Sequence, residues 1–131
     1  MRKLTLILLT LTLLLLNGCG NPHEKLAANA IAILTDVADA LSAIQDGASA
    51  EAAKAELKNL GERWRANERE LAEGKPPTTR DLAKISKKYG AQLEAAVKRY
   101  LAEARRVQKI EGGKDALQEL GELKGGPALP K

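Results

Sequence analysis

This chain of 131 residues has one cysteine, Cys19, and one histidine, His23, the residue types most used as nucleophiles and proton carriers. They lie four residues apart near the N-terminus, so a catalytic triad or histidine-based metal site would need partners from elsewhere in the fold. The Glu-x-x-His pattern of di-iron bundles and the Cys-x-x-Cys-His pattern of covalent haem are absent. We therefore expect no catalytic residue, no metal site and no cofactor, with His23 exposed in a first helical turn.

Carboxylates offer the other route to chemistry. Asp36 and Asp39 are three residues apart, and Glu68, Glu70 and Glu73 are close together in the sequence. Paired acids work as acid and base when burial separates their pKa values, but these residues fall outside or beside the apolar stripes of the helices described below. They are typical of solvated surface charges, and we do not expect an enzyme.

The N-terminal segment predicts export. Met1-Arg2-Lys3 is positively charged, and residues 4–16 form an apolar run of Leu, Ile and Thr. At 13 residues this run is too short to span a bilayer comfortably and fits the apolar region of a signal peptide.

Leu16-Asn17-Gly18-Cys19, directly after that run, resembles the lipobox of bacterial lipoproteins. The resemblance implies that Cys19 receives a diacylglycerol, that residues 1–18 are removed, and that the freed amine is acylated, with fatty acids such as palmitate. Gly20, rather than Asp, follows Cys19, which by the same resemblance favours the outer membrane, facing the periplasm. The alternatives are a buried thiol after an uncleaved anchor, or a stray cysteine in a leader cut elsewhere.

Removal of residues 1–18 would leave 113 residues, enough for one small domain. Without Arg2 and Lys3, the formal charge falls from +4 to about +2. Phenylalanine is absent, so the core must consist mainly of Leu, Ile, Val and Ala. Such a core requires closely packed helices.

All periodic apolar patterns after Cys19 are helical. They predict helices over about 22–46, 49–73, 79–111 and, as a short fourth segment, 114–123, within a domain over 23–124. Residues 19–22 would be the lipidated tether, and residues 125–131 a disordered tail. Asn21-Pro22 and Thr78 with Asp81 are typical helix starts, Ser49 is expected to cap the second helix, and Gly74-Lys75-Pro76-Pro77 is a break.

Short connections between these helices favour packing of sequential neighbours. We therefore expect an all-α fold, an antiparallel three-helix bundle with a short fourth helix. Leu60, Trp64, Leu93 and Tyr100 are expected to be buried, with the hydroxyl groups of Tyr89 and Tyr100 reaching the rim of the core.

The charges divide between helices, because residues 22–46 are acidic and residues 79–111 are basic. The basic helix could contact an anionic surface such as phospholipid head groups or an acidic envelope protein. The residues proposed for this contact are Lys84, Lys87, Lys88, Arg105, Arg106 and Lys109. The competing and favoured explanation is that the acidic and basic helices complement each other. Nucleic acid is not expected, because the chain is exported and no aromatic residues interleave with the bases.

Residues 44–53, the Leu-spaced helix after them, the proline break and the long basic helix are similar to small helical lipoproteins of planctomycete-type bacteria. That resemblance implies no particular activity. Three hypotheses remain: a lipoprotein with a non-catalytic binding or structural role, an adaptor or inhibitor that binds an envelope protein through a helix face, and a ligand- or metal-binding bundle. An exposed apolar patch would favour the second. A cavity lined by Trp64 and the tyrosines would favour the third.

Overall fold

The computed structural model describes residues 21–121 and 123, and these contain four helices and no strand. The helices are α2 (Pro22–Ser42), α3 (Gly47–Glu73), α4 (Thr79–Val107) and α5 (Gly113–Leu120). The all-helical prediction is confirmed. The expected signal peptide over 1–18, Cys19 and the tail over 125–131 lie outside the described residues.

Hydrogen-bonded caps fix where the three long helices begin. The Asn21 side chain accepts from the His23 amide at 2.9 Å, and Pro22 occupies the first turn. Thr78 and Asp81 form the expected capping box, because each side chain accepts from the other residue's amide. The hydrogen bonds from Thr78, first that from its amide, lower the pKa of Asp81.

The start of α3 differs from the prediction. Asp46, rather than Ser49, is the N-cap, and Ser49 is the third helical residue of a capping box. Their hydrogen bonds, first that from the Ser49 amide, lower the pKa of Asp46. The sequence reasoning missed this because both residues are good caps, and only the backbone path selects between them.

Three helices end earlier than expected, and of these α5 ends at Leu120 rather than at residue 123. The first ends at Ser42 rather than near residue 46, followed by a turn in which the Ile44 amide donates to the Leu41 carbonyl. After Val107, the amides of Lys109 and Ile110 donate to carbonyls only three residues back. This tightening ends α4 before residue 111. Gly112, with φ of 72°, then redirects the chain into α5.

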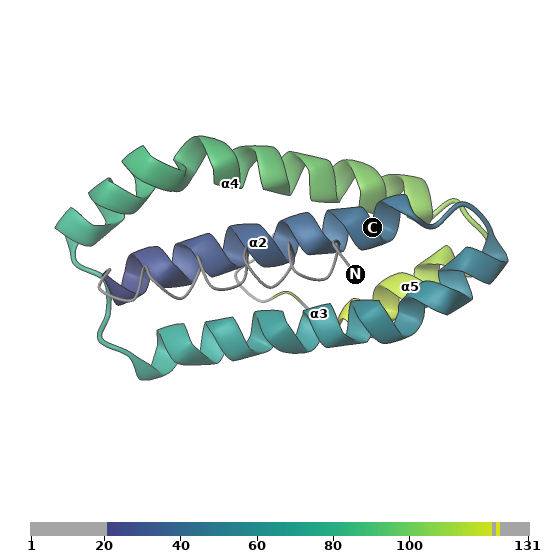
Figure 1. The fold of residues 1–131 in the computed structure, drawn as a ribbon, viewed down its shortest axis with the longest axis horizontal. Helices are drawn as coiled ribbons and strands as arrows, with labels where there is room; N and C mark the ends of the chain where they lie inside the picture. Colours follow the sequence, from purple (N-terminus) through teal and green to yellow (C-terminus); the bar gives the residue numbers. More distant parts are fainter. Residues whose placement is uncertain (1–20, 122, 124–131) are drawn as a thin grey trace, which may run out of the picture.

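α2 lies between α3 and α4; it runs antiparallel to α3 and parallel to α4 (Figure 1). α5 packs mainly against α3 at the end where α4 finishes. No Cα atom of α3 lies within 8 Å of a Cα atom of α4. The expected packing of sequential neighbours therefore holds for α2 with α3 and for α4 with α5, but it is wrong for α3 with α4.

The described core lies around α2 and is completed by all four helices. Leu60, Trp64 and Tyr100 are buried, as predicted. The other large side chains of this core are Ile33, Leu34, Val37, Leu41, Ile44, Leu57, Val107, Leu117, Leu120 and Leu123.

The burial predicted for Leu93 is wrong, because 39 % of this residue is exposed. It lies on the same face of α4 as buried Tyr100, seven residues away. α5 contacts only a small part of α4, and α3 does not contact α4. The first half of the α4 apolar face therefore lacks the cover that Tyr100 has.

The Tyr100 hydroxyl does not reach the rim. The residue is fully buried, and its oxygen has no hydrogen-bond partner among the described residues. Burial raises the pKa of Tyr100 to about 12. A buried hydroxyl without a partner loses its hydration and gains nothing in return, so the ring stabilises the core while the oxygen weakens it.

We expect Tyr100→Phe to leave the domain as stable as the wild type or more stable, by about 1 kcal/mol near pH 7, because it removes only the unpaired oxygen. The unfolded tyrosine loses its proton near pH 10 and the folded one near pH 12, so this group's contribution is present below pH 10 and lost as the pH rises to 12. Thermal denaturation across this range checks both points. Tyr89→Phe is the matched control, and a parallel alkaline loss in wild type and Tyr100→Phe would contradict the assignment.

Candidate functional site

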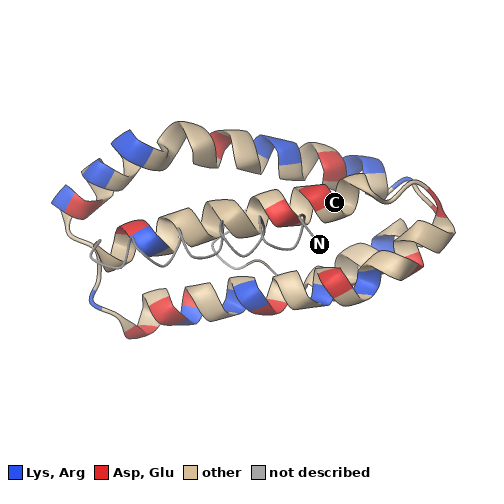
Figure 2. Cartoon of the chain, viewed as in Figure 1, with Lys and Arg blue, Asp and Glu red and all other residues tan. Residues whose placement is uncertain are grey.

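The first basic cluster of α4, Lys84, Lys87 and Lys88, is exposed (Figure 2). Lys88 Nζ lies 3.9 Å from Glu24 Oε2 and 5.2 Å from the centroid of the Tyr89 ring. Lys84 and Lys87 form no ion pair with the described residues. Two of the three bases therefore remain available to a partner.

The second predicted cluster separates in the structure. Arg105 and Lys109 are exposed, but the Arg106 side chain turns toward the end of α2. Its guanidinium donates to the carbonyls of Ile44 at 2.7 Å and Leu41 at 2.8 Å, and Nε donates to Glu103 at 2.9 Å. Arg106 thus donates to two carbonyls after the last turns of α2, one of which, that of Leu41, also accepts from the Ile44 amide. Its guanidinium is therefore engaged within the domain, whereas Arg105 and Lys109 are left for the proposed surface contact.

Ion pairs join the basic helix to the acidic one. Arg99 contacts Asp39 at 2.6 Å and Lys88 contacts Glu24, both between α4 and α2, while Arg63 of α3 contacts Asp36 at 2.9 Å. These side chains are partly exposed, so water screens each pair and its contribution to stability is small. Complementarity between helices therefore accounts for Lys88 and Arg99 but not for Lys84, Lys87, Arg105 or Lys109.

Three leucines of the described helices are exposed to an unusual degree. They are Leu71 on α3 at 46 %, Leu82 on α4 at 54 % and Leu93 on α4 at 39 %. The end of α3 and the start of α4, to which Leu71 and Leu82 belong, lie away from α5 (Figure 1), and Leu93 is at the middle of α4. The adaptor hypothesis requires a contiguous apolar patch, and these leucines, spread over two helices, are the candidates for it.

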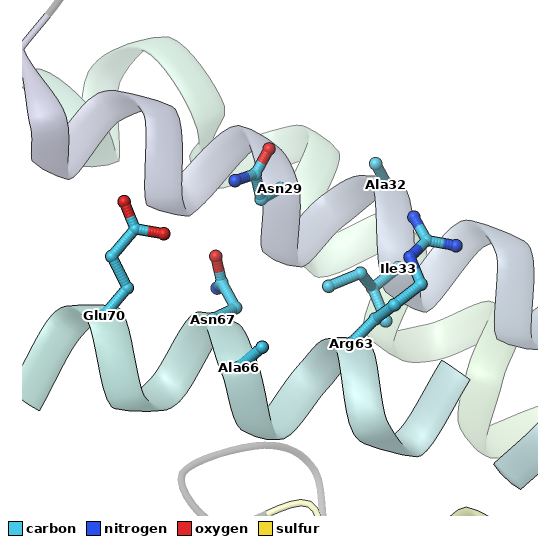
Figure 3. A pocket seen from close by; sticks show the side chains of 7 residues that line it. All are labelled: Asn29, Ala32, Ile33, Arg63, Ala66, Asn67 and Glu70. Carbon is cyan, nitrogen blue, oxygen red and sulfur yellow. The ribbon is translucent and has the colours of Figure 1, made fainter. Parts of the chain in front are cut away.

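A pocket of about 300 Å³ lies between α2 and α3 (Figure 3). Asn67 and Glu70 of α3 point toward the side of α2 that carries Asn29, and Arg63 of α3 lies at the other end of the pocket. Asn67 donates to the Leu26 carbonyl at 3.2 Å, and its own Oδ1 is buried with no hydrogen-bond partner among the described residues. Because this oxygen is buried, it is not offered to a ligand in the pocket, and the Arg63 guanidinium already donates to Asp36.

The pocket differs from the cavity that the ligand-binding hypothesis required. Neither Trp64 nor either tyrosine lines it. Within residues 21–121 and 123, no three His, Cys, Asp or Glu side chains are grouped as metal ligands would be. His23 is half-buried rather than exposed, and its Nδ1 has no partner in the described part of the chain. No sequence pattern indicated this burial, because it depends on how the helices pack.

None of the protein-family models, curated proteins and solved structures compared with this chain matches it. The similarity to small helical lipoproteins therefore stays a prediction. Among the described helices, none combines the length and apolar character needed to cross a membrane.

Proposed function

We propose that this chain is a lipoprotein of the bacterial cell envelope, anchored through Cys19 and with a non-catalytic binding or structural role. The sequence Leu16-Asn17-Gly18-Cys19 after an apolar run carries the proposal. The start of α2 at Pro22, with Asn21 as its N-cap, is consistent with the proposal. Removal of residues 1–18 would leave both residues in place, so α2 would keep its N-terminal cap.

The anchor would hold one molecule of the domain at the membrane without further contacts. Two or more acyl chains on one residue give stable attachment, whereas a single chain gives marginal attachment. With Gly20 after the lipidated residue, we place the protein at the outer membrane, facing the periplasm.

An adaptor role is the second candidate, because Leu71, Leu82 and Leu93 expose apolar surface on one part of the domain. An envelope protein that covers these leucines would be its partner. No nucleic acid partner and no cofactor enter either proposal.

Cys19→Ser is expected to abolish lipidation and processing before residue 19, because the serine hydroxyl does not replace the thiol that accepts the diacylglycerol. Mass spectrometry of the N-terminal peptide and detergent-phase partitioning measure the result. Asn17→Ser is the matched control, since serine is a common residue at that position, and it is expected to retain the lipid. A wild-type product that begins at Asn21 or later and carries no lipid would refute the proposal.

A further inference from the structure

The first turns of α2 and α4 are held together at one end of the bundle. Asn21 Nδ2 donates to Asp81 Oδ1 at 2.6 Å, across 60 residues of sequence. Asp81 also closes the capping box with Thr78, so the residue before α2 is joined directly to the first turn of α4. The beginnings of these helices therefore form a defined end of the molecule, which we call the Asn21 end.

The proposed anchor, Cys19, is close to this end in the sequence. It precedes Asn21 by two residues, and an extended chain spans at most about 3.6 Å per residue, or roughly 7 Å in all. If Cys19 carries the lipid, as the proposed function states, the membrane surface lies within about this distance of the Asn21 end.

The same end presents apolar and basic side chains together. Leu82, the most exposed of the three leucines, is the fourth residue of α4, and Leu71 is two residues from the end of α3. Exposed Arg80, Lys84 and Lys87 surround the first turns of α4 without forming ion pairs among the described residues (Figure 2). Leucine beside Arg and Lys is the composition of segments that lie at the boundary between head groups and acyl chains.

The charges favour the α4 side of this end over the α3 side. The first turns of α4 carry one acidic residue, Asp81, and its carboxylate accepts hydrogen bonds from Thr78 and Asn21. The last turn of α3 instead carries Glu70 and Glu73. An anionic surface would attract the first side and repel the second, so the contact should centre on Leu82 rather than on Leu71.

The second basic cluster is too far away to join this contact. Arg105 lies 25 residues after Arg80 on the same helix, which corresponds to about 37 Å at 1.5 Å per residue. This length is several times the Debye length of about 8–10 Å at physiological salt. With the Asn21 end at the membrane, Arg105 and Lys109 would point away from it.

We propose that the Asn21 end docks on the anionic lipid leaflet that holds the Cys19 anchor, with Leu82 entering the head-group boundary and Arg80, Lys84 and Lys87 binding lipid phosphates. The inference rests on the proposed lipidation of Cys19 and adds the orientation of the domain and the residues that set it. α4 then stands away from the membrane instead of lying along it.

The test uses the full-length lipidated protein in vesicles with and without phosphatidylglycerol. Ala83→Cys and Ala102→Cys place an environment-sensitive fluorophore at exposed positions near the two ends of α4, while lipid blocks the thiol of Cys19. Quenching by spin-labelled lipid reports proximity to the membrane. We expect at least fivefold stronger quenching at position 83 than at 102 in anionic vesicles, falling with salt. Leu82→Ser and Lys84→Glu are each expected to reduce the quenching at position 83 at least twofold.

Other outcomes would overturn the inference. Equal quenching at both positions would show a domain lying along the surface, and no quenching at either would show one held clear of it. Shielding of position 83 that depends on protein density but not on lipid charge would assign Leu82 to a second copy or another protein. Mass spectrometry of each sample separates the two proposals, because a lipidated protein without docking refutes only the orientation, whereas an unlipidated one refutes the anchor.

Discussion

Leu60→Ala is expected to lower the free energy of unfolding by about 2–5 kcal/mol, a large share of the stability of so small a domain. Only 3 % of Leu60 is exposed, and it belongs to the core shared by the four helices. Removal of its side chain leaves a cavity that helices already packed around alanines cannot easily close. Denaturant unfolding followed by helical circular dichroism measures the loss.

Leu93→Ala is the matched control for this substitution. It removes the same atoms from a side chain that is 39 % exposed, so no closed cavity forms and the expected loss is only about 1 kcal/mol. Equal losses for the two variants would show that a partner or a different packing covers Leu93 in solution.

Gly61→Ala is expected to destabilise the fold by roughly 1–3 kcal/mol or more, although alanine is the better helix former. A Cβ atom at this position would collide with the backbone carbonyl of Leu120 in α5, which flexible side chains cannot relieve. α3 and α5 would have to separate, and the hydrogen bond from Arg65 to the Leu120 carbonyl, at 3.3 Å, would be disturbed.

Gly90→Ala provides the opposite control within α4. Its Cβ would meet only the Ser86 hydroxyl, at an ordinary 3.8 Å, so the gain in helix propensity of about 0.5–1 kcal/mol is kept. The two alanine variants are therefore expected to shift the thermal midpoint in opposite directions. A stabilised Gly61→Ala protein would mean that α5 does not pack against α3 as described.

The sequence predicted the features that are encoded locally. Asn21 with Pro22 and Thr78 with Asp81 are complete within four residues, and the structure contains both starts. The helical periodicity also identified the buried faces around Leu60, Trp64 and Tyr100. These features depend on residues that are neighbours in the chain, so a pattern in the sequence is enough to predict them.

The features that were missed depend on distant segments. Periodicity places Leu82 and Leu93 on the apolar face of α4, but it does not reveal that α5 is too short to cover them. Arg106 looked like a surface base because its partners, the carbonyls at the end of α2, are more than 60 residues away. Gly61 had no signal, since only the approach of Leu120 gives it a role.

The free bases of α4 illustrate the same limit at the candidate site. Six residues were proposed for an anionic contact from their spacing alone, and the structure leaves Lys84 and Lys87 near one end and Arg105 and Lys109 near the other. Spacing along a helix predicts which charges share a face. It does not predict which of these charges will form an ion pair or hydrogen bond with a neighbouring helix.

The return of α5 to α3 has a consequence for the order in which the chain folds. α2 and α3 are consecutive and can pair soon after they form, whereas the contact of Gly61 with Leu120 closes a loop of nearly sixty residues. Such closure carries an entropic cost before it yields any contact, and it slows folding relative to bundles built only from local contacts. A nascent chain that ends before Gly113 keeps the α3 surface around Gly61 uncovered, so the core is complete only after α5, the fourth of the described helices, has been synthesised.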